Sequence, residues 1–105
     1  MAFTQTGTPY YASPEIWRDE PYSSKADMWS FGCLVYEMAA FRPPFEASDI
    51  EQLYKKIKKG KYDAVPGEYS AELSEVIAIC LNKKVEKRLS AEELLSLPIF
   101  IRKCA

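Results

Sequence analysis

The stretch SKADMWSFGCLVYEMAAF, residues Ser24–Phe41, is apolar around nearly the whole circumference of a helix. At about 100° per residue, its apolar side chains do not collect into one stripe. A helix of this kind has to be covered on nearly all sides, so we predict that it is the buried central helix of a helical domain. Its length approaches that of a membrane span, but four polar residues interrupt it, namely Lys25, Asp27, Ser30 and Glu37.

Helix-start signals divide the rest of the chain. Capping boxes are predicted at Ser24–Asp27, Ser48–Glu51 and Ser90–Glu93, where a serine precedes an acidic residue by three positions. Ser13 is expected to cap a short helix with Pro14 at its first position and to end it near Arg18, and Ser70 is expected to cap a third long helix. These signals predict helices separated by short loops, and no stretch reads as a convincing strand.

The spacing of apolar residues predicts which helix faces point inward. The helix predicted after Ser48 has apolar residues at i, i+3, i+4 and i+7, namely Ile50, Leu53, Tyr54 and Ile57, which indicates a single apolar face. The later helices are expected to turn these residues inward: Leu73, Val76, Ile77, Cys80, Leu81, Leu94 and Leu95. Together the patterns predict an all-α fold.

Composition limits the classes of function. The 105 residues allow one domain at most. Fourteen basic and 15 acidic side chains give a net charge of -1, so we expect neither nucleic acid nor membrane as a partner. The absence of histidine excludes Ser-His and Cys-His nucleophiles and most zinc sites, so no metal site is expected. Three widely spaced cysteines (Cys33, Cys80 and Cys104) and the lack of a signal-peptide pattern favour the cytoplasm.

Three motifs resemble a eukaryotic protein kinase. Gly7–Glu15 (GTPYYASPE) resembles the end of the activation segment, with Ser13-Pro14-Glu15 in place of the family's Ala-Pro-Glu. Asp27–Gly32 (DMWSFG) resembles the Asp-x-Trp-Ser-x-Gly at the start of the family's central helix, and Arg88 stands where the family has its distal arginine. The order and spacing agree, and the resemblance covers essentially the whole chain.

Further stretches are similar to the NIMA-related serine/threonine kinases. They include Tyr36–Ala40, Pro43–Phe45, Gly60–Tyr62 and Tyr69–Leu73. The connector before and after Arg88 departs from the family, because Lys84-Val85 and Leu89 replace an Asp-Pro and a Pro. This departure bears on the rigidity of the connector but not on the arginine.

The resemblance implies the lower half of a kinase C-lobe, with about five helices around a buried central helix. Residues 1–12 would end the activation segment, residues 13–98 would form the helical C-lobe, and residues 99–105 would be a tail. The glycine loop, strand lysine, catalytic loop and Asp-Phe-Gly that serve ATP and Mg in the family are absent from this sequence. We therefore expect no catalytic residue and no cofactor in this fragment, which would be inactive alone; ATP and Mg would belong to the intact parent.

The resemblance also implies a substrate-binding loop. Gly7, Thr8, Pro9, Tyr10 and Tyr11 would form the pocket for the substrate residue after the phosphorylated one, with Thr8 favouring serine or threonine substrates. The alternative is a Gly-Pro turn with two packing tyrosines.

Two threonines precede this loop. Thr4 matches the regulatory phosphorylation position of NIMA-related kinases and Thr6 is second, although either could be an ordinary loop threonine.

Five residues would have structural roles by resemblance. Glu15 and Arg88 would form a buried ion pair. The alternative is that Glu15 is only a carboxylate favoured by the dipole in the first turn of its helix and that Arg88 is a solvated charge in a connector. Asp27 would cap its helix in this chain or bind the catalytic loop in the parent. Trp29 belongs to the core on either interpretation, and Gly32 belongs to the same motif.

Two functions remain open at this stage. The first is a piece of a cytoplasmic serine/threonine kinase, with cytoskeletal association as a family alternative, whose partners are protein substrates and the rest of the kinase domain. The second is a non-catalytic, kinase-derived helical module that binds partners through Asp49–Lys59. The lysines at the end of this helix and just after it form either an acidic-partner patch or a solvated helix end, namely Lys55, Lys56, Lys58, Lys59 and Lys61. As a fragment, the chain should expose an apolar patch.

Overall fold

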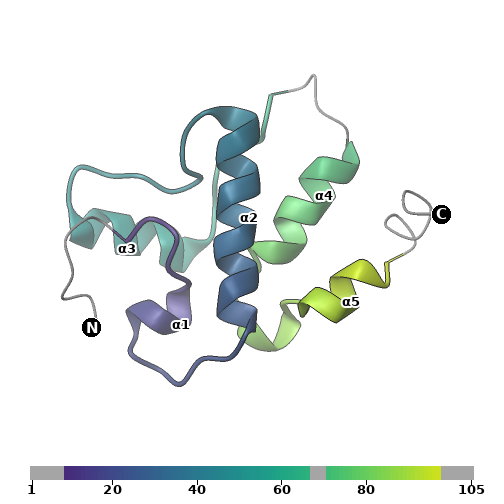
Figure 1. The fold of residues 1–105 in the computed structure, drawn as a ribbon. Helices are drawn as coiled ribbons and strands as arrows, with labels where there is room; N and C mark the ends of the chain where they lie inside the picture. Colours follow the sequence, from purple (N-terminus) through teal and green to yellow (C-terminus); the bar gives the residue numbers. More distant parts are fainter. Residues whose placement is uncertain (1–8, 67–70, 98–105) are drawn as a thin grey trace.

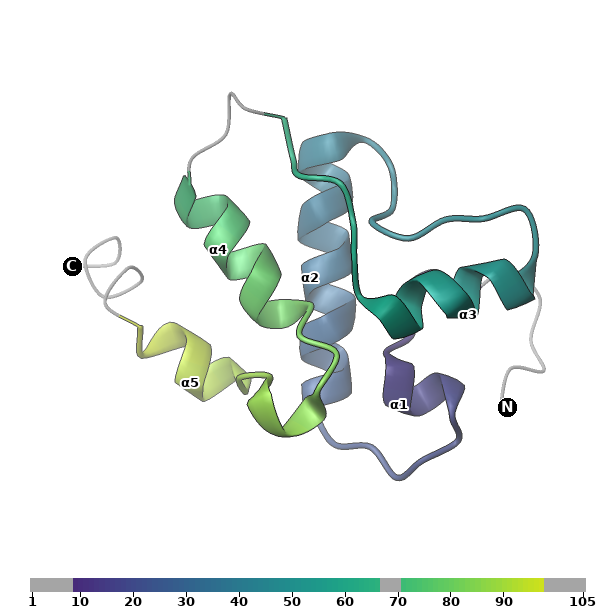
Figure 2. The same ribbon diagram turned by 180° about the vertical axis from the view of Figure 1, so that it is seen from behind.

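The computed structural model describes residues 9–66 and 71–97. Their helices are α1 (Pro14–Trp17), α2 (Lys25–Ala40), α3 (Ile50–Lys59), α4 (Ala71–Cys80) and α5 (Ala91–Leu95), with a 3-10 turn η1 at Val85–Lys87. Within these residues there is no strand, so the prediction of an all-α fold is confirmed. Figure 1 shows α2 upright in the middle, with α1 and α3 on one side and α4 and α5 on the other. Figure 2, seen from behind, shows the same arrangement.

The main core lies against α2 and includes residues of the helices on both of its sides. Trp29 is completely buried and stacks on Phe45, with ring centroids 5.6 Å apart. Seven further buried residues complete this cluster: Trp17, Cys33, Tyr36, Leu53, Ile57, Ile77 and Leu81. A smaller cluster of Met28, Cys80 and Leu94 joins α2 to α4 and α5.

One side of α2 contradicts the prediction of burial all round. Phe31, Leu34, Met38 and Phe41 are 45%, 48%, 70% and 87% exposed. Phe31, Leu34 and Met38 lie at i, i+3 and i+7 on one face of the helix, and Phe41 is the residue that ends it. We call these four residues the apolar stripe. Among the described residues this face stays largely open, so α2 is not covered on nearly all sides. The exposed face agrees with the apolar patch expected of a fragment.

The helix caps follow the sequence signals only in part. Ser90 forms the complete predicted box: its hydroxyl accepts from the Glu93 backbone N–H at 3.2 Å, and Glu93 accepts from the Ser90 N–H at 2.8 Å. At α3 the cap is Asp49 and not Ser48, because the Asp49 carboxylate accepts from the Gln52 N–H at 2.8 Å. Gly60 ends α3 with a positive φ of 72°.

The predicted capping box at Ser24 is wrong. Ser24 has helical backbone angles and its side chain makes no cap hydrogen bond. The hydroxyl of Ser23 accepts from the Lys25 N–H instead, at 3.2 Å. Ser13 occupies the N-cap position of α1, and its side chain also makes no cap hydrogen bond. Ser70, the predicted cap of the third long helix, lies outside the described residues.

Two apolar residues predicted to point inward are exposed. Ile50 is 43% exposed because it begins α3, one turn before the buried Leu53. Leu95 is 60% exposed at the last position of α5, whereas its neighbour Leu94 is buried.

Candidate functional site

The loop before α1 lies against the core. Tyr10, Tyr11 and Ala12 are half-buried and pack on the main cluster. The Ser30 hydroxyl on α2 donates to the backbone carbonyl of Tyr11 at 2.8 Å. This bond fixes the end of the loop to the central helix. Sequence reasoning treated Ser30 only as a polar interruption of α2, although its place in the DMWSFG motif was a signal.

Glu15 and Arg88 form a buried bidentate ion pair. Arg88 Nη1 donates to Glu15 Oε2 at 2.8 Å, and Nη2 donates to Oε1 at 3.1 Å. The two side chains are 2% and 0% exposed, although 73 positions separate them. Paired charges in this forked geometry are strong and directional. The pair therefore joins the start of α1 to the connector that follows α4.

Arg88 also contacts three other residues, two of them in α2. Its Nε donates to the Asn82 carbonyl at 2.8 Å, and Nη1 donates to the Lys25 carbonyl at 2.9 Å. The guanidinium carbon lies 5.2 Å from the ring centroid of Trp29, a cation–π distance. Arg88 thus links α1, the start of α2 and the connector through its own contacts, next to Trp29 of the main core.

The charge of Glu15 is stabilised by these contacts. Burial raises the pKa of its carboxyl, but the hydrogen bonds and the charge of Arg88 more than offset this, so the pKa lies below its ordinary value of 4.5. Glu15 therefore stays ionised opposite the guanidinium at neutral pH.

Gly32 and Asp27 differ in their surroundings. A Cβ atom on Gly32 would come within 2.5 Å of the Cys80 Cβ, so the glycine allows close approach of α4.

Asp27 is exposed at the start of α2, and the capping bond predicted for it is not formed. The Asp27 carboxylate therefore does not cap α2, which was the role expected for it in this chain.

The buried thiols are poorly suited to reaction. Burial raises the pKa of Cys33 to about 12 and that of Cys80 to about 11. Both are free cysteines. Because the thiolate is the reactive form, they serve as core residues.

The comparison with protein families identifies the fold. The model of the protein kinase domain matches residues 2–100. The chain belongs to the protein kinase domain family. As a kinase C-lobe fragment it has the all-α architecture that its sequence predicted.

The similar proteins are NIMA-related kinases. The chain is 47% identical over 94 residues to the probable serine/threonine-protein kinase nek2 of Dictyostelium discoideum, covering 90% of this chain and 22% of that protein. It is 47% identical over 99 residues to human serine/threonine-protein kinase Nek2, covering 94% and 22%. The G2-specific protein kinase nimA of Emericella nidulans is 42% identical, with 94% and 14% covered. The chain thus spans about a fifth of the length of the first of these relatives.

The described part of the chain offers no set of residues that fits the cofactors of the kinase family. Among residues 9–66 and 71–97, no group of three His, Cys, Asp or Glu side chains could hold a metal ion. The sequence also lacks a phosphate-binding glycine loop. The residues present therefore do not fit ATP or Mg, and no step through either group follows from this structure. Within the described part, no helix has the length and apolar content to cross a membrane.

Four predicted site residues of the kinase loop lie outside the described residues, namely Thr4, Thr6, Gly7 and Thr8. Of the remaining candidates, Pro9, Tyr10 and Tyr11 lie in the loop held by Ser30, next to α1. The structure brings Glu15, Trp29 and Arg88 together. Asp27 is not part of this group, and the start of α2 has no side-chain cap hydrogen bond.

Proposed function

We propose that this chain is the substrate-positioning and activation part of a serine/threonine protein kinase, and that the intact protein transfers a phosphoryl group from ATP to serine or threonine in proteins. The observation that carries the proposal is the buried pair of Glu15 and Arg88. It anchors α1 directly after the loop that would receive the substrate. We divide the chain as residues 1–12 (activation-segment end), 13–98 (helical C-lobe) and 99–105 (tail).

The substrate pocket is assigned to Gly7–Tyr11. Tyr10 and Tyr11 support this, because both pack on the core and the Tyr11 carbonyl is held at 2.8 Å by Ser30. A loop fixed at this end can present a defined surface to an extended peptide. Thr8 would favour a serine or threonine in the substrate.

The activation switch is assigned to Thr4, with Thr6 as the second candidate. A phosphate there would add about -1.5 to -2 charges and would seek a cationic partner. In this proposal that partner lies in the rest of the kinase domain. Free thiols at Cys33 and Cys80 agree with a cytoplasmic location for the whole protein.

The rest of the kinase domain is the expected partner of two surfaces on α2. The apolar stripe supports this, because three large apolar side chains on one face of α2 and the Phe41 that ends the helix are 45–87% exposed. Asp27, which makes no capping bond at the start of the same helix, would bind the backbone of the catalytic loop. ATP and Mg would be held by that other part, and this chain's own residues would hold and orient the protein substrate. On its own the chain should neither bind ATP with Mg nor phosphorylate a peptide.

A graft tests the proposal. The matching 99-residue segment of human Nek2 would be replaced by this chain, and phosphorylation of a serine peptide would be measured. We expect an active graft, and a reduced preference for serine and threonine peptides after Thr8→Val. Ser48→Ala, a substitution at an exposed position outside the proposed pocket, is the control and should leave activity unchanged. A folded graft that binds ATP but transfers no phosphoryl group would refute the proposal.

A further inference from the structure

The segment between α3 and α4 lies against the central helix. Residues 61–66 contain no helix, turn or bend, and Figure 2 shows them rising beside α2 from the end of α3. Tyr62 and Val65 are half-buried and pack on the main core, whereas Asp63 and Ala64 between them are exposed. We call residues 61–65 the open segment. It presents one side to the core and another to the solvent.

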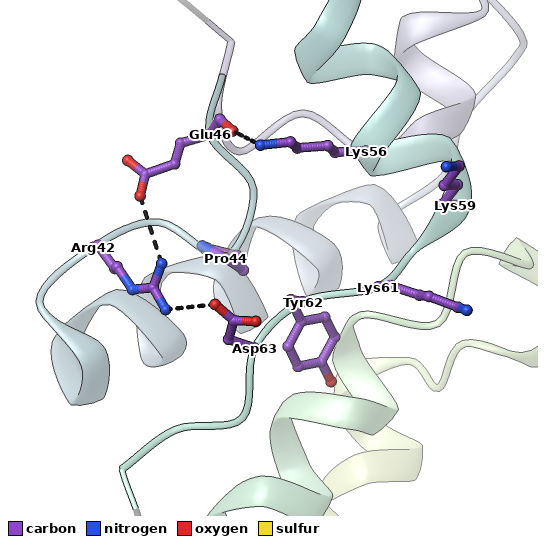
Figure 3. A pocket seen from close by; sticks show the side chains of 8 residues that line it. All are labelled: Arg42, Pro44, Glu46, Lys56, Lys59, Lys61, Tyr62 and Asp63. Carbon is purple, nitrogen blue, oxygen red and sulfur yellow. Dashed lines mark hydrogen bonds and ion pairs between the residues drawn. The ribbon is translucent and has the colours of Figure 1, made fainter. Parts of the chain in front are cut away.

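Contacts from α2 and from the loop after it hold the open segment in place. The Tyr36 hydroxyl donates to the Asp63 backbone carbonyl at 2.6 Å, and Arg42 pairs with the Asp63 carboxylate at 2.9 Å. The Tyr62 ring packs edge-on against Tyr36 and Phe45, with centroids 5.5 and 5.9 Å away. Figure 3 shows Asp63 turned toward Arg42 and Tyr62 turned away from it. A partner of this segment therefore has little of its conformational entropy left to remove.

The backbone of the open segment is almost entirely unpaired within the described part of the chain. Its one hydrogen bond there is the contact at the Asp63 carbonyl, and none of its five N–H groups donates to a described residue. Pro66, which has no N–H, follows the segment. An exposed run of unpaired main-chain donors and acceptors is a template on which another chain can add a strand.

Hollows lie on both sides of the open segment. The first, of about 310 Å³, lies between the segment and α4, and its lining residues are Tyr62, Ala64, Val65, Ser74 and Ile77. The second, of about 280 Å³, lies toward α3 and the loop after α2 (Figure 3). Neither is lined by the loop before α1 or by the Glu15–Arg88 pair, so both are separate from the proposed kinase site. The mainly apolar lining of the first hollow suits an apolar side chain.

The simpler explanation is that water alone satisfies the unpaired backbone, as it does in many loops. Hydration requires neither a fixed conformation nor hollows beside the chain. The open segment has both, because aromatic packing, a hydroxyl and an ion pair hold it between two hollows. Peptide recognition by strand addition uses this combination: main-chain hydrogen bonds supply affinity, and pockets for alternate side chains supply specificity.

We propose that the open segment is a docking site for an extended segment of a partner protein, which pairs with its backbone as an added strand and places an apolar side chain in the hollow beside α4. Residues with a branched β-carbon suit such a partner, because they favour the extended conformation. This inference does not depend on the proposed function.

A second copy of this chain fits the open segment less well. If two copies paired in antiparallel fashion over all five residues, Asp63 at the centre of one copy would lie directly opposite Asp63 of the other. Like charges directly opposite each other destabilise a pair of strands. The expected partner is therefore a different protein.

Amide hydrogen exchange with a capped heptapeptide of alternating valine and threonine tests the proposal. Because main-chain bonds carry the affinity, this peptide is a sufficient probe. At saturation it should slow exchange of the Tyr62–Val65 amides about fivefold or more, and it should leave the amides of residues 22 and 23, in the exposed loop before α2, unchanged. The fully N-methylated peptide, which donates no main-chain hydrogen bond, should bind about fivefold more weakly or worse.

Two pairs of variants separate the backbone from the hollow. Ala64→Pro removes one N–H of the open segment and should weaken peptide binding about fivefold, whereas Ala64→Ser keeps the N–H and should change binding less than about twofold. Ser74→Tyr fills the hollow and should also weaken binding, whereas Glu75→Tyr, at the next exposed position of α4 and outside the hollow, should not. Circular-dichroism melting with unchanged midpoints shows that lost binding is not lost folding.

Three outcomes would overturn the proposal. The first is unchanged exchange of the Tyr62–Val65 amides at the highest soluble peptide concentration. The second is equal binding of the methylated and unmethylated peptides, which would leave no role for the backbone. The third is slower exchange at the same amides as the concentration of the chain alone rises, which would assign the open segment to a second copy.

Discussion

Gly32 on α2 lies against Cys80 on α4, so closely that a Cβ atom on Gly32 would come within 2.5 Å of the Cys80 Cβ. The Leu81 side chain lies 3.2 Å from the same point. These contacts are with buried groups between two packed helices, and the Cβ of Cys80 is held by its backbone. The absence of a side chain at position 32 therefore sets how closely α4 approaches the central helix.

Gly32→Ala should destabilise the chain. Overpacking of this kind typically costs about 1–3 kcal/mol, and it should outweigh the gain of up to about 1 kcal/mol that alanine brings to a helix interior. Chemical unfolding measures the difference. A variant more stable than the wild type would show that α2 and α4 do not approach this closely.

Asp49→Ala should cost about 1 kcal/mol of unfolding free energy, because the carboxylate that accepts from the Gln52 N–H is lost at the start of α3. Ser48→Ala, one position earlier, is the matched control and should change stability by a few tenths of a kcal/mol. Thermal melts of both variants separate the two capping assignments. Equal losses, or a larger loss at Ser48, would favour the box that the sequence predicted.

Stability should fall in acid, partly through Glu15. Its pKa in the folded chain is below 4.5, so the unfolded chain takes up the proton first as pH falls. The contribution of Glu15 is complete above about pH 5 and is lost as pH drops through 4.5 toward the lower folded pKa. Urea midpoints at pH 6 and 3.5 measure this, and the decrease should be smaller in Glu15→Gln. Glu86→Gln, at an exposed position, should keep the wild-type decrease.

The apolar stripe should bind hydrophobic dyes and promote association of the isolated chain. Leu34→Lys/Met38→Lys places charges on this face and should reduce both dye fluorescence and oligomer content without a loss of stability, since the side chains are 48% and 70% exposed. Ile50→Lys, at another exposed apolar position, is the control and should leave dye binding near the wild-type level. A monomeric wild-type chain that binds no dye would show that the stripe needs no partner.

The local features of the fold were the most predictable. The Ser90–Glu93 box was predicted because all of its donors and acceptors lie within one helical turn. The Ser24 box failed although its pattern is the same. There the carbonyl of Lys25 accepts from Arg88, and Ser23 takes the capping contact. The Ser23 contact is also local, so the serine pattern by itself did not distinguish two adjacent serines, and the bond from Arg88 is one that no local pattern contains.

The candidate site was less accessible to sequence reasoning. Composition and spacing led only to a helical domain; the pairing of Glu15 with Arg88 came from resemblance, because nothing local connects positions 73 apart. The carbonyls of Asn82 and Lys25 could not have been found, since any residue type can supply them. The apolar pattern of α2 likewise does not predict whether the residues that cover each of its faces belong to this chain.

The most direct test of the Glu15–Arg88 link is a double-mutant cycle of unfolding free energies with Glu15→Gln, Arg88→Gln and the double variant, in an osmolyte that keeps all of them folded. Each single substitution should cost about 3–5 kcal/mol, because it leaves the partner charge buried and unpaired. The double variant should cost less than the sum of the two, by about 1–3 kcal/mol. Small, additive losses would contradict the link and would reduce the pair to an incidental contact.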